Sequence, residues 1–291
     1  MYKKLIGIFV CMLLIATFAI PISALNKVYE NNPEPITEDE DVPVWEVDDS
    51  WTYNAVLFLN SSSPNQTLEY TIEAEFVLTV VDDTGDSYIL EGIGQSVSGG
   101  VDLGLLGLKT TRFSKIAAQL QMRKTDLGLE FWNQNMKGIL LLMIGPITLP
   151  IPIQLEANTD VEFNPTWVIT PFPLYDGKNG TFDDTELMHT NSFIHSFWGL
   201  IPISGPDEYS WHTGEVPYTC TEEQVTVPAG MFDVFYITGD HYYGENGHDY
   251  YRTYYSPEAG NSVKESIHIG NELETTYFSF DLELISTTYT P

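Results

Sequence analysis

Asp83 comes closest to a catalytic motif in this sequence. With Thr84 and Gly85 it matches the core of the aspartic-protease signature, in which two carboxylates share one proton. The next residue is Asp86 rather than Ser or Thr, and no second Asp-Thr-Gly or Asp-Ser-Gly occurs. A polar turn explains these residues, so a hydrolase is a distant alternative. With Asp82 the same turn could hold calcium, but it lacks the closing glutamate of a calcium loop.

A second cluster could ligate a metal ion. His241, His248 and Asp249 supply two imidazoles and a carboxylate, with Glu245 between them. Their spacing matches no zinc signature, and the glycines beside them are typical of a hairpin tip. We therefore expect an exposed hairpin here, without a metal ion or another cofactor.

No nucleophile motif is present. The segment from Gly94 to Ser98 ends in serine where the nucleophile elbow requires glycine. Cys220 lies in a predicted strand, where a lone cysteine is more often a small buried hydrophobe than a nucleophile. The sequence therefore identifies no catalytic residue and favours a non-enzymatic protein.

Two long apolar runs could bind a ligand. The first covers residues 138–153 and contains three prolines, which argue against a membrane span. One interpretation is a buried core strand with an extended exit. The other is that the run forms the wall of an apolar cavity, with residues 197–203 facing it. Such a cavity would bind a lipid or another hydrophobic small molecule. Its wall would be formed by Leu140, Leu142, Ile144, Ile147, Leu149, Ile151, Phe197, Trp198, Leu200 and Ile201.

Three triplets are candidates for N-glycosylation. They begin at Asn60, Asn65 and Asn179, and each has Ser or Thr two positions later. Such triplets are compatible with glycosylation outside the cell, although they also arise often by chance.

The secondary-structure elements that would position these candidate residues are predicted to be strands. Residues 51–58 are rich in β-branched and aromatic side chains, and Asp82 to Asp86 is a strong turn between two such runs. Residues 114–122 could form a helix, but they alternate, and Lys124 to Asp126 favours a second hairpin. Further strand pairs flank 228–230 and 256–261, and residues 277–285 alternate. We therefore predict a mainly β protein. Similar openings at Val47 and at Phe172, with a proline-dense stretch from Pro165 to Pro173 between them, predict two related halves, 45–165 and 166–291.

The N-terminus predicts export. Lys3 and Lys4 precede an apolar stretch that Pro21 ends, and Ala24 offers a cleavage site, so residues 1–24 form a signal peptide. Alternatively residues 5–24 remain as a membrane anchor, which would be the chain's only contact with a membrane. Residues 25–44 form an acidic, proline-containing linker. We expect an extracellular or cell-surface location.

Composition excludes several classes of protein. The chain has 291 residues, 12 Lys and Arg against 41 Asp and Glu, and a formal net charge of −29. Nothing in so acidic a chain would neutralise a phosphate backbone, so we expect no nucleic-acid partner. The aromatic content of 13% excludes global disorder. Oligomeric state cannot be read from these numbers.

Three segments resemble a known family. Val227 to Asp233 is similar to a V-P-A-G-T-F turn, Tyr254 to Lys264 is similar to a Y-Y-S-P-E-x-G-x-x-V-K turn, and Trp51 begins a W-T-Y opening. Together they resemble exported proteins of unknown function related to the lipoprotein-localisation-factor superfamily. The resemblance is strongest over 172–286, although Asn179 stands where a tryptophan is expected. It implies a curved antiparallel sheet, an unclosed barrel, whose concave face can hold acyl chains.

Two functional hypotheses follow. The first is an exported protein that binds a lipid or another hydrophobic ligand in an apolar concave face. The second is a cell-surface structural or adhesion module, which the acidic surface, the glycosylation triplets and the N-terminal linker would suit.

Overall fold

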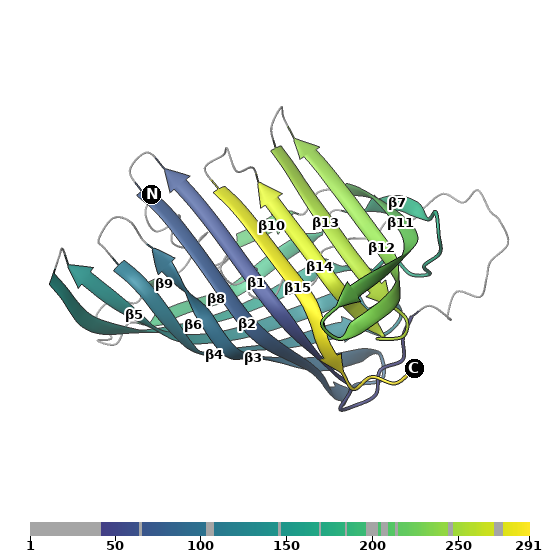
Figure 1. Ribbon diagram of the computed structural model, residues 1–291, viewed down its shortest axis with the longest axis horizontal. Coiled ribbons are helices and arrows are strands. Elements are labelled where there is room, and N and C mark those ends of the chain that lie inside the picture. Colours follow the sequence, from purple (N-terminus) through teal and green to yellow (C-terminus); the bar gives the residue numbers. More distant parts are fainter. Residues whose placement is uncertain are drawn as a thin grey trace.

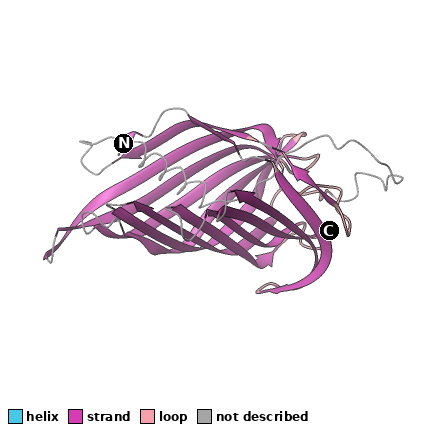
Figure 2. Cartoon of the chain, turned by 90° about the horizontal axis from the view of Figure 1, so that it is seen from above, coloured by secondary structure: helices cyan, strands magenta, loops and turns pink. Residues whose placement is uncertain are grey.

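The fold is a single curved antiparallel sheet in a computed structural model of the chain (Figures 1 and 2). The structure describes residues 42–291, except 64–65, 103–107, 145–146, 169, 184, 196–202, 205–208, 213–214, 244–246 and 271–275. Side chains of some strand residues, among them 138–159, also lie outside the description. The predicted signal peptide and most of the predicted linker precede the described residues, in which no helix has the length and apolar character to cross a membrane.

Two antiparallel meanders make up most of the sheet. The first comprises β1 (Ser50–Ser63), β2 (Gln66–Asp83), β3 (Ser87–Asp102), β4 (Leu108–Arg123), β5 (Leu129–Ile144) and β6 (Ile147–Trp167). The second comprises β11 (Val216–Val227), β12 (Gly230–Tyr243), β13 (Gly247–Ser256), β14 (Asn261–Gly270) and β15 (Thr276–Thr287). These strands confirm each hairpin that the turn residues predicted, including β4–β5 in place of a helix.

Pairing between the first and last strands joins the two meanders. β1 runs antiparallel to β15, with Trp51 opposite Thr287 and Leu57 opposite Phe280. The sheet therefore continues from one meander into the other. Residues 165–166, where the two predicted halves meet, lie near the end of β6.

The remaining strands extend the two edges. β8 (Glu186–His195) pairs with β6, and β9 (Ile203–Ser204) and β10 (Tyr209–His212) pair with β8. At the opposite edge, β7 (Asn179–Phe182) pairs with β11. The strand order ends at β10 on one side and at β7 on the other, so the described strands do not close the sheet. This confirms the predicted unclosed barrel.

A short link holds the two edges near each other. β7 ends at Phe182 on one edge, and β8 begins at Glu186 beside the other. A chain of this length spans at most about 15 Å between those two Cα atoms. Asp183 and Thr185 within the link are buried. The sheet therefore curls until its edges approach, as the two layers in Figure 2 illustrate.

The hydrophobic core lies between the two layers. Strand residues alternate, so Trp51, Tyr53 and Leu57 of β1 point inward while Asn54 and Val56 are exposed. The large side chains with almost no exposure are Trp51, Trp132, Trp167, Leu90, Leu120, Leu129, Ile267 and Leu284. The core is made by residues from both meanders, which explains how a chain with one cysteine outside the predicted signal peptide is stabilised without a disulfide.

Val42, Pro43 and Trp45 are the first described residues that pack against this core. Val42 packs on the core, Pro43 is buried, and the indole Nε1 of Trp45 donates a 2.8 Å hydrogen bond to the carbonyl of Gly260. Trp51 makes the same kind of bond, 2.7 Å long, to the carbonyl of Ala259. Both tryptophans therefore tie the start of the first meander to the β13–β14 turn.

The predicted apolar run 138–153 is divided between two strands. β5 ends at Ile144 and β6 begins at Ile147, and these two residues are opposite each other. The run was expected to be one strand with an extended exit. Gly and Pro at 145–146 interrupt it in the sequence, and such a pair favours a reversal of the chain over its continuation.

Candidate functional site

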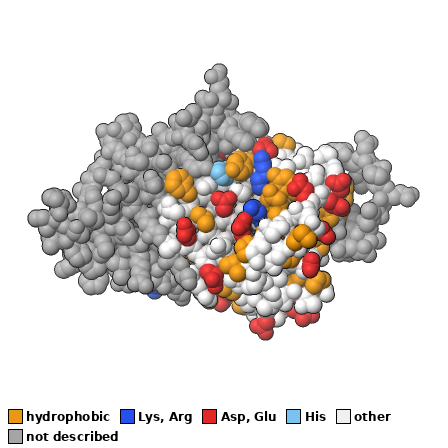
Figure 3. Space-filling view, in the orientation of Figure 1, with side chains coloured by type: hydrophobic (Ala, Val, Ile, Leu, Met, Phe, Trp, Pro, Cys, Tyr) orange, Lys and Arg blue, Asp and Glu red, His pale blue; other side chains and the backbone are white. Residues whose placement is uncertain are grey.

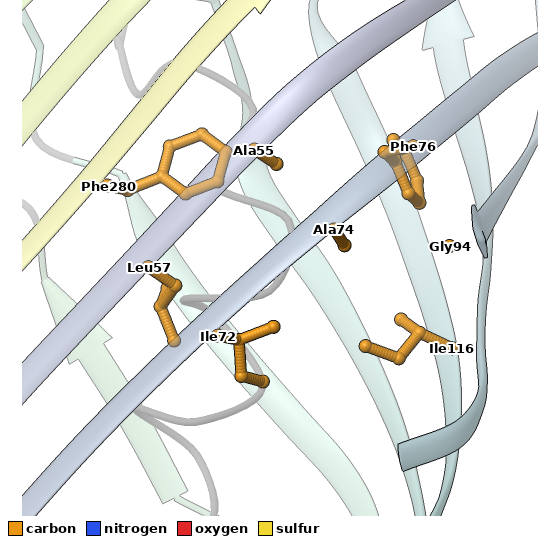
Figure 4. Close-up of a pocket in the computed structure, with 8 residues that line it drawn as sticks. All are labelled: Ala55, Leu57, Ile72, Ala74, Phe76, Gly94, Ile116 and Phe280. Carbon is orange, nitrogen blue, oxygen red and sulfur yellow. The ribbon is translucent and has the colours of Figure 1, made fainter. Parts of the chain in front are cut away.

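A small apolar pocket lies on the inner face of the sheet (Figure 4). Its lining residues come from five neighbouring strands, β1, β2, β3, β4 and β15. Its volume is about 20 Å³, which is room for little more than one water molecule. The lining contains no charged or polar side chain: Ala55, Leu57, Ile72, Ala74, Phe76, Gly94, Ile116 and Phe280.

Strand register brings these residues together. Ala55 is opposite Ala74, and Leu57 is opposite both Ile72 and Phe280. Because residues that pair across antiparallel strands point to the same face, all of them line the interior. Small residues at Ala55, Ala74 and Gly94 leave the hollow that larger neighbours surround.

The sequence did not identify this pocket. Its residues come from five separate strands, and the apolar stretch that contains Ala55 and Leu57 reads as an ordinary buried strand. The sequence does place small residues, Ala55 and Ala74, at inward positions of two strands. They predict a hollow only once β1 is known to pair with β2, because that pairing sets the two alanines opposite each other.

The predicted ligand wall lies only partly within the described residues. Leu140, Leu142 and Ile144 belong to β5, and Ile147, Leu149 and Ile151 belong to β6. The backbones are paired, with Leu142 opposite Ile151. Side chains at these positions are not described. Phe197, Trp198, Leu200 and Ile201 lie outside the described residues altogether.

A buried carboxyl group also faces the interior. Glu265 on β14 has 4% of its surface exposed and alternates with the buried Val263 and Ile267. Burial raises the pKa of Glu265 to about 8, although a hydrogen bond with Ser262 acts in the opposite direction. The pKa of Tyr53 is also raised, first by burial and then by the nearby Glu265. At neutral pH Glu265 is therefore mostly protonated and uncharged.

The possible metal cluster falls on a hairpin. His241 on β12 is opposite Asp249 on β13, and His248 is opposite Tyr242. The histidine side chains and Glu245 lie outside the description. Among the side chains that are described, no group of three metal-ligating residues occurs.

Asp83, the last residue of β2, holds the β2–β3 turn through its side chain. Its Oδ1 accepts a 2.8 Å hydrogen bond from the Gly85 amide and lies 2.5 Å from the Lys124 ammonium. The hydrogen bond from Lys124 and that from Gly85 lower the pKa of Asp83. Asp82 and Asp86 beside it are exposed. The ion pair with Lys124 links the β2–β3 turn to the β4–β5 turn.

Cys220 is a buried thiol. It is fully buried on β11, and burial raises its pKa to about 11. The group is therefore protonated at neutral pH and is a poor nucleophile.

One of the three glycosylation candidates has a described, exposed side chain. Asn179 is the first residue of β7, at the edge of the sheet. Asn60 lies in β1 but its side chain is not described, and Asn65 lies outside the described residues.

Comparisons with known proteins identify no relative: no family model, curated protein or solved structure matches the chain. The resemblance to lipoprotein-localisation factors therefore stays a prediction from the turn motifs.

Proposed function

We propose that this is an exported, non-enzymatic protein that binds a lipid or another hydrophobic ligand on the concave face of its sheet. The observation that carries the proposal is the wholly apolar pocket on the inner face. A ligand would enter between the two sheet edges, which the described strands do not close. Burying an alkyl chain there would contribute about 0.8 kcal/mol per methylene.

The described pocket would be the deep end of a larger site. A ligand cavity usually encloses about 300–1,000 Å³, and the pocket has about 20 Å³. The rest of the site would lie toward residues 140–151, whose strands β5 and β6 continue in the same sheet. A neutral alkyl tail fits this lining because no ionised side chain contributes to it.

A cell-surface structural or adhesion module is the second candidate. The filled interior around Trp51, Trp132 and Trp167 favours it, since a ligand carrier needs open volume. The face seen in Figure 3 carries acidic side chains scattered among neutral and hydrophobic ones, with basic side chains near its centre. Such a surface would suit contact with a cationic partner.

Native mass spectrometry followed by lipid extraction separates the two candidates. Protein purified from its own cells should carry a lipid that is released only on denaturation. An unliganded mass, together with no binding of a fluorescent long-chain fatty acid, would favour the structural module. The same spectrum reports whether residues 1–24 have been removed.

A matched pair of variants tests the location of the site. Ala55→Leu fills the pocket, whereas Val56→Leu adds to the outer face of the same strand, where Val56 is 38% exposed. Displacing about one methylene of a ligand, which is as much as the described pocket can hold, should weaken binding of the fluorescent fatty acid by about fourfold. We expect Val56→Leu to bind like the wild type. Equal affinities for both variants would place the ligand elsewhere.

A further inference from the structure

The edge strand β7 carries a glycosylation triplet in an exposed setting. β7 pairs with β11 on one side, and among the described strands the order ends with it. The triplet Asn179-Gly180-Thr181 forms three of its four residues. Both functional members, Asn179 and Thr181, are exposed.

The residues on the inner face of β7 determine that Asn179 and Thr181 point outward. Phe182 is buried and stacks on Tyr218 with ring centroids 4.3 Å apart. A Cβ at Gly180 would lie 2.7 Å from the Tyr218 hydroxyl oxygen, so only glycine lets the strand approach that ring. Because Gly180 and Phe182 face Tyr218, alternation directs Asn179 and Thr181 to solvent.

The Asn179 amide is also available for reaction. Its Nδ2 donates a 3.3 Å hydrogen bond to the carbonyl of Gly177, two residues away. This local bond is long, so giving it up costs little. A substituent on Nδ2 would extend away from the core.

We propose that Asn179 carries an N-linked glycan that shields the β7 edge of the open sheet. The amide nitrogen bonds to the anomeric carbon of a sugar from a polyprenyl-phosphate-linked oligosaccharide. The bond from that carbon to the phosphate oxygen breaks, the lipid phosphate leaves, and the amide loses one proton. This inference rests on the export included in the proposed function.

The glycan would serve a physical purpose at this position. An unpaired edge strand offers backbone groups to other chains and promotes edge-to-edge association. Acidic side chains protect the neighbouring part of β11, where Glu222 and Glu223 are exposed. β7 itself has no charged residue. A bulky, hydrated glycan would supply the missing protection.

Peptide mass mapping of the full chain from its own cells tests the proposal. The peptide containing Asn179 should carry a glycan mass that chemical deglycosylation removes. Thr181→Ala should abolish it and Thr181→Ser should retain it, since serine also completes the triplet. Circular dichroism melts should be alike for both variants because residue 181 is exposed. We also expect Thr181→Ala to form more oligomers on size-exclusion chromatography.

The outcomes separate glycosylation from export. An exported protein with a processed N-terminus and an unmodified Asn179 would overturn the glycan alone. A protein that stays inside the cell with residues 1–24 intact and Asn179 unmodified would overturn both export and glycosylation. Retention of the glycan in Thr181→Ala would assign the sugar to another residue and overturn the proposal.

Discussion

Glu265 shows how a single residue in this core responds to pH. Its carboxyl group lies on β14, opposite Leu282 on one side and Thr253 on the other. Such surroundings solvate a neutral carboxylic acid far better than a carboxylate. Its pKa of about 8 in the folded protein lies well above that of an unfolded chain, where glutamate ionises near its ordinary value.

We expect the stability of the protein to fall as pH rises from about 4.5 to about 8. Over that range the unfolded chain releases the Glu265 proton and the folded chain keeps it, which lowers the free energy of unfolding by about 1.4 kcal/mol per pH unit. Glu265→Gln should remove this slope and raise the free energy of unfolding at pH 7 by about 3 kcal/mol. Urea unfolding between pH 5 and pH 9 measures both effects.

Glu258→Gln is the control for this prediction. It makes the same chemical change seven residues earlier, at an exposed position in the β13–β14 turn. Its pH dependence should match that of the wild type. Parallel stability curves for Glu265→Gln and wild type would show that Glu265 is not the titrating group.

At the scale of elements, close contact between β2 and β3 depends on a glycine. The ring of Phe76 on β2 lies across Gly92 on β3, where a Cβ would be 2.1 Å from its Cζ atom. The same ring lines the inner-face pocket. Gly92 therefore sets both the position of Phe76 and the shape of the pocket.

Gly92→Ala should destabilise the protein by about 1–3 kcal/mol, because the half-buried Phe76 ring must move into packed surroundings. Chemical denaturation measures the loss. Ile93→Ala is the control: Ile93 is 45% exposed on the opposite face, and its change should stay within about 0.5 kcal/mol. Phe76→Leu should restore part of the stability in the Gly92→Ala background. Failure of that rescue would argue against a steric cause.

At the scale of the whole molecule, the two meanders share one core. β1 pairs with β15, and Trp51 donates its indole hydrogen bond to Ala259, 208 residues later. Trp45 and Trp51 also contact each other, with ring centroids 5.0 Å apart. Neither meander keeps these contacts without the other.

Unfolding should therefore occur as one transition. Tryptophan fluorescence and far-UV circular dichroism should give coincident melting curves. Trp51→Ala should cost about 3–5 kcal/mol and shift both curves together. Val44→Ala, at a 76% exposed position, should shift neither. Two separate transitions, with Trp51→Ala moving only one, would show that 45–165 and 166–291 unfold as independent units.

Local sequence determined the strands and their turns. The turn at Asp83 depends on a side-chain hydrogen bond to Gly85, and Gly85 has a φ of 95°, a conformation that glycine adopts readily. Such signals act within a few residues, so the hairpins and the mainly β class could be predicted. The buried setting of Cys220 followed from its place in an alternating strand.

Only the tertiary structure decided how distant strands meet. Pairing of β1 with β15, the short link that holds the sheet edges together, the pocket and the burial of Glu265 all depend on residues far apart in the chain. Register across such separations is selected by the burial of complete strand faces, not by neighbouring residues. In the sequence, Glu265 looks like any solvated glutamate, and Ala55 looks like an ordinary strand residue. Both acquire their roles from the strands beside them.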